Sequence, residues 1–266
     1  MFTSSKNGVS ALELQRALEI GSYATAWAML QRLRAVVVRD GREPLAGTVE
    51  VDETFVGGKE RGKALGRSPG TKKTLVVVAV ETRGTSLGRV RLQAVPDASG
   101  ASLVPFIRKN IEPDSIVVTD GWHPYKQITR HGYHHLPNSH RLAVATGVDL
   151  DDLTPAVHRV ASLLKRWLLG THQGAARAEH LQGYLDEFAF RFNRRRSASR
   201  GLLFLRLLQL AVDHDPVRYQ HLVANPQPKN DATTVKRTGR TANHPPSLER
   251  SSPDRPWRTE PDGPLT

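Results

Sequence analysis

Residues 74–81, TLVVVAVE, form a continuous apolar run that is rich in valine. A run of this kind is typical of a β-strand that is buried on both of its faces. Residues 89–95 then alternate between polar and apolar side chains, and Gly84 and Gly88 stand between the two segments. The pattern predicts two strands that are joined by a hairpin.

Further strands and a helix flank this hairpin in the sequence. Residues 47–55, GTVEVDETF, predict a strand before it, and residues 115–119, SIVVT, predict a short strand after it. Residues 99–111 have apolar side chains at helical spacing, so a helix separates the third strand from the fourth. Three strands in succession, a helix and a fourth strand fit an α/β fold with a mixed sheet and helices on its faces.

The segment before the sheet is predicted to be helical. Ser10 can cap a first helix over residues 11–18, with Glu13 in the capping-box position, and Ser22 opens a second helix after Gly21. A short helix, a turn with glycine and a longer helix that ends in arginines are typical of a helix-turn-helix, although many plain helical hairpins share this outline. Both interpretations stay open on these residues alone.

The predicted elements divide the chain into three parts. Residues 1–46 form the small helical, helix-turn-helix-like segment, and residues 47–214 form the α/β domain. Polar residues and proline dominate residues 215–266, so this segment is predicted to be a disordered tail. Further helices of the α/β domain are expected over residues 155–169, 177–191 and 202–212.

The composition favours a nucleic-acid partner. Lys and Arg number 38 against 26 Asp and Glu, which gives a net charge of +12. A surplus of this size favours a polyanion, although a protein that is merely basic is the alternative. No apolar run is long enough to span a membrane and no secretory signal is recognisable, so we expect a cytoplasmic protein. The absence of cysteine excludes disulfides and thiolate-bound zinc or iron–sulfur sites.

Two aspartates occupy positions in which a carboxylate is costly. Asp52 interrupts a strand whose neighbours Val49 and Val51 are expected to be buried, and Asp120 stands at the C-terminal end of the strand over residues 115–119. A buried carboxylate needs a partner or a metal ion, and ligands in α/β sheets gather at strand ends. If the two strands are neighbours, both side chains point into one crevice that suits a divalent cation. The alternative is two separate aspartates that cap strand ends.

A helix supplies two more candidates, His158 and Lys165. They are seven residues apart, close to two helical turns, so both lie on one face of the helix predicted over residues 155–169. A helix can in this way direct an imidazole to a metal ion and an ammonium group to a phosphate beside it. Taken alone, a histidine of this kind is more often a surface residue than a ligand.

Five strings occur along the chain in a characteristic order: VEVDETFVGGK, TLVVVAVE, VVTDGWHPY, VHRVASLLKRWLLGTHQG and LDEFAFRFNRR. Over residues 7–212 the chain resembles the transposases of the IS fifteen-ninety-five insertion-sequence family, which carry an ISXO-two-like transposase domain. The resemblance implies a ribonuclease-H-like fold with a DDE-type catalytic core. The family's two Asp positions match Asp52 and Asp120. Its third position, which is Glu, Asn or His in relatives, matches His158, and its following Lys matches Lys165.

The resemblance implies a DNA transposase that hydrolyses and rejoins phosphodiester bonds in the double-stranded DNA of element ends and target. Asp52, Asp120 and His158 would bind two Mg²⁺ ions, for which Mn²⁺ can substitute, and Lys165 would hold the phosphate backbone. Because histidine is a poorer Mg²⁺ ligand than a carboxylate, His158 is alternatively a group that positions the nucleophile. The resemblance also implies a homo-oligomer on DNA, located in the bacterial cytoplasm and associated with the nucleoid.

Relatives commonly begin with a zinc ribbon of CxxC pairs, which this sequence lacks. Our interpretation is that either the open reading frame is truncated or its start is assigned too far downstream. An inactive DNA-binding remnant is therefore an alternative to the active transposase. A related nuclease with a ribonuclease-H fold is a third alternative.

Four further features carry weaker functional interpretations. The Gly- and Lys-rich residues 57–73 predict a loop that either grips phosphates or is simply solvated. Trp122 is expected to pack rather than to stack on a base, and a zinc site at His134, His135 and His140 is not expected. The arginine-rich residues 191–196 are expected to end a helix and contact the DNA backbone, or to form a solvated face.

Overall fold

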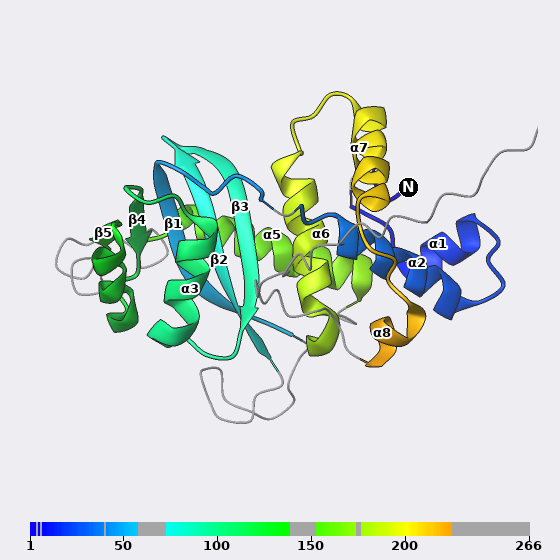
Figure 1. The fold of residues 1–266 in the computed structure, drawn as a ribbon, viewed down its shortest axis with the longest axis horizontal. Coiled ribbons are helices and arrows are strands. Elements are labelled where there is room, and N and C mark those ends of the chain that lie inside the picture. Colours follow the sequence, from blue (N-terminus) through cyan, green and yellow to red (C-terminus); the bar gives the residue numbers. More distant parts are fainter. Residues whose placement is uncertain are drawn as a thin grey trace, which may run out of the picture. The chain divides into compact units, whose positions relative to one another are not determined.

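The computed structural model describes residues 1–3, 5, 7–39, 41–57, 73–138, 153–173 and 177–224. These residues belong to one compact unit, Met1–Lys229, while the second unit, Asn230–Thr266, lies outside the described residues. In chain order, two helices precede three strands, a helix, a fourth strand, a 3-10 helix, a fifth strand and a final series of helices (Figure 1). None of the helices in the described part of the chain is long and apolar enough to cross a membrane.

A mixed sheet of order β3-β2-β1-β4-β5 forms the centre of the fold. β2 is antiparallel to both β1 and β3, whereas β4 is parallel to both β1 and β5. The α/β class and the mixed sheet are therefore confirmed, and the arrangement is compatible with a ribonuclease-H-like fold. The strands are β1 (Thr48–Val56), β2 (Thr74–Arg83), β3 (Ser86–Val95), β4 (Ile116–Thr119) and β5 (His134–Pro137).

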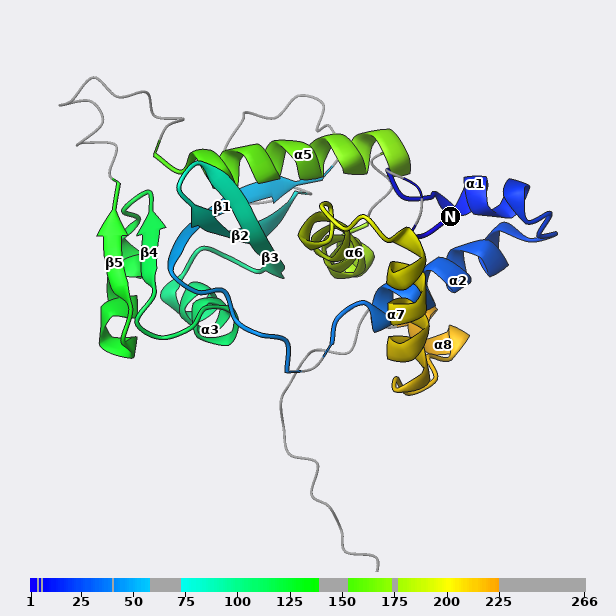
Figure 2. The same ribbon diagram turned by 90° about the horizontal axis from the view of Figure 1, so that it is seen from above.

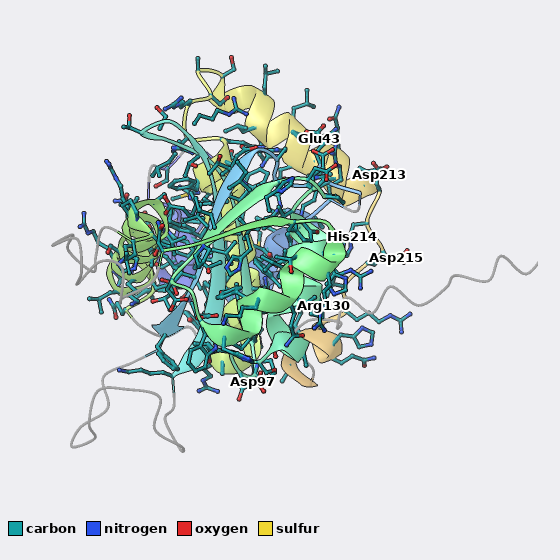
Figure 3. The ribbon with its side chains drawn as sticks, turned by 90° about the vertical axis from the view of Figure 1, so that its left-hand side faces the viewer. Glu43, Asp97, Arg130, Asp213, His214 and Asp215 are labelled. Carbon is teal, nitrogen blue, oxygen red and sulfur yellow. The ribbon has the colours of Figure 1, made fainter. Side chains whose placement is uncertain are left out.

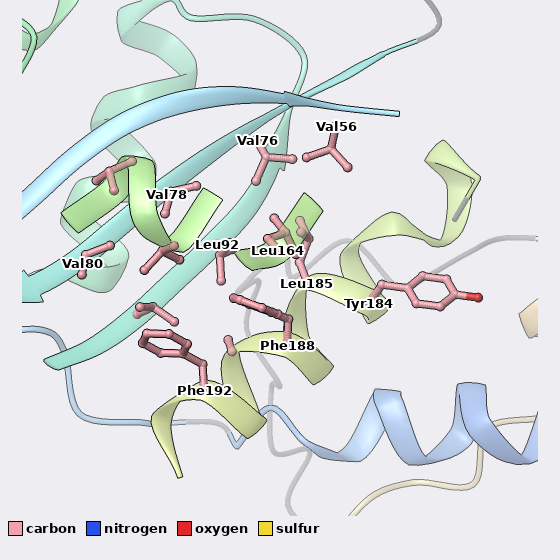
Figure 4. Close-up of a cluster of buried hydrophobic side chains, with 14 of the residues drawn as sticks. Val56, Val76, Val78, Val80, Leu92, Leu164, Tyr184, Leu185, Phe188 and Phe192 are labelled. Atoms are coloured by element: carbon pink, nitrogen blue, oxygen red, sulfur yellow. The ribbon is translucent and has the colours of Figure 1, made fainter. Parts of the chain in front are cut away.

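Helices cover both faces of this sheet (Figure 2). On one face lie α3 (Gly100–Asn110) and the 3-10 helix η1 (His123–His131), and on the other lie α5 (Pro155–His172) and α6 (Leu181–Asn193). Side chains alternate between the faces along a strand, so β2 contributes to both cores. Val76, Val78 and Val80 pack against α5 and α6 (Figure 4), while Val77 and Ala79 pack on the α3 side. This double burial explains why the valine run shows no polar alternation.

The beginning of α3 shows how short-range hydrogen bonds set the ends of the helices. The carboxylate of Asp97, which is labelled in Figure 3, lies just before the helix. It accepts hydrogen bonds from the Ser99 backbone N–H and the Ser102 hydroxyl. The same holds for α1 (Ala11–Ala17), where the Ser10 hydroxyl accepts a hydrogen bond from the Glu13 N–H at 3.1 Å. The predicted N-cap at Ser10 is thus present.

The N-terminal helices pack on the far side of α6. The helices α1, α2 (Tyr23–Val36), α6 and α7 (Arg200–Val212) contribute to a third apolar cluster, which includes Val9, Leu30, Phe190 and Leu207. A further helix, α8 (Tyr219–Ala224), lies within the segment that the sequence predicts to be a disordered tail from residue 215. Residues 225–266 lie outside the described residues.

β5 and η1 are not predicted from the sequence. The four residues of β5 are His-His-Leu-Pro, and they form an edge strand whose side chains are largely exposed, so no apolar alternation marks it. η1 ends at Gly132, whose φ of +80° is the left-handed conformation that glycine adopts most readily.

Candidate active site

Asp52 and Asp120 lie on neighbouring parallel strands. β1 and β4 pair with Glu50 opposite Val118, and Asp120 comes directly after the last residue of β4. Continuing this register by two residues places Asp120 beside Asp52, with both side chains on the face that α5 covers. The neighbouring-strand condition on which the sequence argument depended is therefore met.

The carboxylate of Asp52 is held by two hydrogen bonds from different elements. Its Oδ1 accepts the N–H of Glu53 at 2.7 Å, and its Oδ2 accepts the hydroxyl of Thr154 at 3.1 Å. Burial raises the pKa of Asp52 above its usual value, and the nearby Asp120 carboxylate adds to the rise, while the two hydrogen bonds and His158 oppose it. Asp52 is thus a carboxylate whose surroundings favour neutralisation by a proton or a cation.

His158 lies directly against Asp52. Its Nε2 is 3.4 Å from Asp52 Oδ2, and 42% of the His158 side chain remains exposed against 15% of the Asp52 side chain. The imidazole therefore reaches the carboxylate from the first turn of α5 while one side of the ring faces solvent. The structure thus brings this sequence-predicted pair together.

Glu50 connects α5 to the sheet, and sequence reasoning missed it. Its Oε2 accepts the backbone N–H groups of Ala156 and Val157 at 2.8 and 3.1 Å. These are N–H groups of the first helical turn, which have no partner inside the helix. Burial raises the pKa of Glu50, while the two backbone hydrogen bonds oppose the rise. The signal in the sequence was a second acidic residue two positions before Asp52, on the same face of the strand.

Thr154, at the start of α5, directs its side chain to the sheet and not to its own helix. It is the N-cap residue and is fully buried, yet its side chain makes no capping hydrogen bond. Its hydroxyl is directed to Asp52 instead, and Glu50 supplies the acceptor for the helix. The two residues together fix the position of the turn that carries His158.

Lys165 lies two turns further along α5, at an exposed position. Burial of part of the side chain lowers its pKa, and the adjacent positive charge of Lys73 lowers it further. Lys73 directly precedes β2, whose first residue pairs with the last residue of β1. The ammonium groups of Lys73 and Lys165 therefore lie near the C-terminal end of β1. Lys165 and His158 are both carried by α5.

Tyr125 and Glu53 form a hydrogen-bonded pair on the other side of β1. The Tyr125 hydroxyl donates to Glu53 Oε1 at 2.7 Å, and the tyrosine is fully buried. Burial raises the pKa of Tyr125 well above its usual value, and the carboxylates of Glu53, Asp52 and Asp120 raise it further. Tyr125 therefore stays protonated and anchors η1 to the strand that carries Asp52.

Some of the side chains at this site are suitable ligands for a hard divalent cation. Asp52 and Asp120 offer carboxylate oxygens, which Mg²⁺ and Mn²⁺ prefer, and each Asp52 oxygen keeps a lone pair beside its present hydrogen bond. His158 Nε2 faces Oδ2 of Asp52, the oxygen that also accepts the Thr154 hydroxyl. However, among the described residues no group of three or more His, Asp or Glu side chains is arranged to hold a metal ion. The two aspartates fit the metal, and the role of His158 as a third ligand remains a proposal.

Two of the remaining candidate residues, Trp122 and His135, lie close to Asp120. The Trp122 N–H donates to Asp120 Oδ1 at 2.8 Å, and its indole N–H donates to the Ala98 carbonyl at 3.0 Å. His135 Nε2 is 2.9 Å from the Thr119 hydroxyl, His134 is exposed, and His140 lies outside the described residues. Of the Gly- and Lys-rich segment, residues 58–72 also lie outside them.

The arginines at the end of α6 are largely engaged within the protein. Arg191 donates to the carbonyls of Phe2 and Ser5, and Arg195 donates to those of Leu87 and Gly88. The predicted contacts of residues 191–196 with DNA stay a prediction.

The comparisons with known proteins agree with these observations. A family model that is described as the ISXO2-like transposase domain matches residues 44–193, which is more than half of the chain. The matched segment runs from β1 to the end of α6 and includes Asp52, Asp120, His158 and Lys165. Neither a curated protein nor a solved structure gives a significant match.

Proposed function

The chain belongs to the family of ISXO2-like transposase domains, and we propose from this that it catalyses metal-dependent hydrolysis and strand transfer of the DNA of an insertion sequence. The observation that carries the proposal is the position of Asp52 in β1 and of Asp120 directly after the neighbouring parallel strand β4, with His158 3.4 Å from Asp52. Two carboxylates on neighbouring strands of one sheet can share the divalent cations that assist phosphoryl transfer.

In the proposed reaction, a water molecule attacks a phosphorus atom at the element end, and the bond to the 3′-oxygen breaks to leave a 3′-hydroxyl. That hydroxyl then attacks a phosphodiester of the target, so that one P–O bond forms and one breaks. His158, whose Nε2 lies 3.4 Å from the Asp52 carboxylate, orients the attacking hydroxyl. Lys165 holds the phosphate backbone in line for the attack.

Asp52 and Asp120 are the residues that would hold Mg²⁺ or Mn²⁺, with His158 beside them. A divalent cation supplies charge stabilisation for the oxygens of the scissile phosphate and lowers the pKa of water. The raised pKa of Asp52 supports this assignment, because a carboxylate disfavoured by burial and by a second carboxylate gains most from a cation.

The proposed partner is double-stranded DNA, both the element ends and the target. The net charge of +12 supports this partner, because a basic protein gains affinity from the release of counterions. We further propose that the protein works in the bacterial cytoplasm, at the nucleoid, as a homo-oligomer that holds two element ends.

The test is a strand-transfer assay that joins labelled element-end DNA to a target plasmid in Mg²⁺ or Mn²⁺. We expect joined product from the unaltered protein, none after chelation by EDTA, and none from Asp120→Asn. Asp213→Asn is the matched control, since Asp213 is exposed and lies beyond α7. Joining by Asp120→Asn would overturn the proposal. Cleavage without joining would indicate a nuclease, and DNA binding without cleavage would indicate an inactive remnant.

A further inference from the structure

A cavity of about 330 Å³ opens at the β3 edge of the sheet, away from the aspartate pair. Its walls come from the connection between α2 and β1, from β3, and from the helices α6 and α7. β2 separates β3 from the strand that carries Asp52, so the cavity is not part of the candidate active site. Six of the lining residues are arginines: Arg39, Arg42, Arg89, Arg91, Arg194 and Arg206.

Carboxylates do not balance this charge among the described residues. Two acidic residues line the cavity, Glu43 and Asp186. The Glu43 side chain is 83% exposed and stands at the surface (Figure 3). Burial raises the pKa of Asp186 to about 6, so this carboxylate is still mostly ionised at pH 7, but it is one negative charge among six arginines. A third carboxylate, Glu81, lies close by and pairs with Arg89 at 2.9 Å.

Except for Arg89, which donates to Glu81 and lies 3.6 Å from Glu43, the inner arginines make their hydrogen bonds to neutral oxygens. Arg42 donates to the amide oxygen of Asn110, Arg91 donates to the carbonyls of Val90 and Glu43, and Arg194 donates to the Phe190 carbonyl. Guanidinium groups that are crowded together and partly desolvated are costly unless an anion stands among them.

Arg91 carries a buried hydrogen-bond donor that no acceptor in the described residues satisfies. It is 5% exposed, and its Nε is buried without a hydrogen-bond partner in the described part of the structure. Burial lowers the pKa of Arg91 to about 10, and the charges of Arg42, Arg89 and Arg194 contribute to the decrease. The four guanidinium groups therefore act on one another across the same cavity.

The exposed arginines complete a gradient toward the surface. Arg39 and Arg206 are exposed, Arg42, Arg89 and Arg194 are half-buried, and Arg91 is buried. The positive charges of Arg206 and Arg39 lower the pKa of Arg194 in addition to the effect of burial, which shows that the outer and inner groups are close. An anion would thus meet positive charge from the mouth of the cavity to its floor.

We propose that this arginine-lined cavity binds a phosphate group. Guanidinium groups bind phosphate oxygens through paired, charge-assisted hydrogen bonds, and the cavity has room for one such group with its bound water. The phosphate comes either from a DNA backbone that passes the β3 edge or from a free phosphate compound. The first source depends on the proposed function, whereas the second does not.

Binding of inorganic pyrophosphate, measured by isothermal titration calorimetry in EDTA, tests the site directly. The double variant Arg39→Gln/Arg206→Gln removes two exposed charges at the mouth, so it should fold normally. The double variant Arg108→Gln/Arg130→Gln removes two exposed charges that do not line the cavity and is the matched control. We expect the mouth variant to weaken binding by about tenfold or more, and the control by less than about twofold.

The source of the phosphate is decided by adding random-sequence duplex DNA. If the DNA displaces pyrophosphate, and the mouth variant lowers the salt dependence of DNA binding by about one to two phosphate contacts, the DNA backbone is the ligand. If pyrophosphate binds and the DNA does not displace it, a free phosphate compound is the ligand. Pyrophosphate binding that the mouth variant leaves unchanged would overturn the proposal. So would an absence of pyrophosphate binding together with equal DNA affinities of the mouth and control variants.

These measurements require neither a divalent metal nor cleavage. A negative result therefore leaves the strand-transfer proposal intact, and an inactive Asp52–Asp120 site leaves the phosphate site intact.

Discussion

Asp52 is a residue whose chemistry is set by its immediate partners. Its carboxylate is disfavoured by burial and by Asp120, and is supported by the hydroxyl of Thr154. Because a proton and the proposed cation compete for this carboxylate, cleavage at a subsaturating Mg²⁺ concentration should fall as the pH decreases. The raised pKa of Asp52 should make this competition by protons begin at a higher pH than for an ordinary aspartate.

Thr154→Val tests this dependence. The valine keeps the volume but removes the hydrogen bond that opposes the rise, so the pKa of Asp52 in the metal-free protein should rise further. Protons then compete better with Mg²⁺, and the acidic limb of the pH–rate profile at subsaturating Mg²⁺ should move to higher pH. We expect a loss of cleavage rate of about 10-fold at neutral pH, typical of residues that orient a metal ligand. Thr154→Ser, which keeps the hydroxyl, should restore both the rate and the profile; an unchanged profile in Thr154→Val would contradict the assignment.

Asp186 allows a prediction about stability. Its pKa of about 6 lies above the usual 3.8 because of burial, so the folded protein binds this proton more tightly than the unfolded chain. Stability from this group is therefore complete below pH 3.8 and is lost as the pH rises through 6, by up to about 3 kcal/mol. Asp186→Asn should be more stable than the unaltered protein at pH 7 and lose that advantage toward about pH 4. Urea unfolding at both pH values measures the difference, with Asp213→Asn as the exposed control.

Several residues of the site could be predicted from the sequence, and others could not. Asp52 and Asp120 stand out because an acidic residue in or just after an apolar strand is conspicuous. Thr154, Tyr125 and Glu50 are ordinary in their local context. Their roles depend on partners 102, 72 and 106 residues away, and nothing in the local pattern encodes those contacts.

At the scale of elements, the position of α5 matters most, since it carries His158 and Lys165. α5 packs on β1 and β2 through its apolar face, and Glu50 fixes its first turn. The arrangement joins a helix N-terminus, with its partial positive charge, to a carboxylate of the sheet.

Glu50→Gln should loosen this connection. The amide oxygen can still accept a hydrogen bond, but the negative charge is lost and the amide N–H₂ has no acceptor from the helix turn. We expect a loss of about 1 kcal/mol in the free energy of unfolding, together with slower cleavage because His158 is held less firmly. Glu112→Gln, at an exposed position, is the control and should change neither quantity. Equal stability of the two variants would exclude a structural role for Glu50.

The elements could be predicted where a long apolar pattern marks them. β1 to β4, α3 and α5 all have such patterns, and their observed bounds differ from the predicted ones by only a few residues. β5 and α8 have no comparable pattern, because they lie at an edge of the sheet or near the surface, where packing constrains the sequence little. η1 buries only Tyr125 and Ile128 among its nine residues, which is too few to mark a helix in the sequence.

For the whole molecule, a buried ion pair connects the N-terminal helices to the α/β fold. Arg34 of α2 lies 2.8 Å from Glu187 of α6, with side chains that are 1% and 0% exposed, and its guanidinium stacks 4.0 Å from the ring centre of Tyr184. The sequence predicts residues 1–46 as a separate segment. In the structure they share this contact and an apolar cluster with α6 and α7, and the predicted division stays a prediction.

Arg34→Met should destabilise the whole unit, because it leaves the Glu187 carboxylate buried without its cation. We expect a loss of about 3–5 kcal/mol in the free energy of unfolding, seen in a single cooperative transition. Arg32→Met alters an exposed arginine of the same helix and should cost less than about 1 kcal/mol. If instead only the N-terminal helices unfolded in Arg34→Met, the two parts would be independent.

The contact between Thr154 and Asp52 also has a consequence for synthesis of the protein. The two residues are 102 positions apart, so the ribosome makes β1, β2, β3 and β4 well before α5 emerges. At translation rates of about 5–20 residues per second, roughly 5–20 s pass between the synthesis of Asp52 and the synthesis of Thr154. Under the proposed function, a nascent chain that already contains both aspartates cannot yet cut DNA. Cleavage activity arises only after α5 has been synthesised and has packed on the sheet.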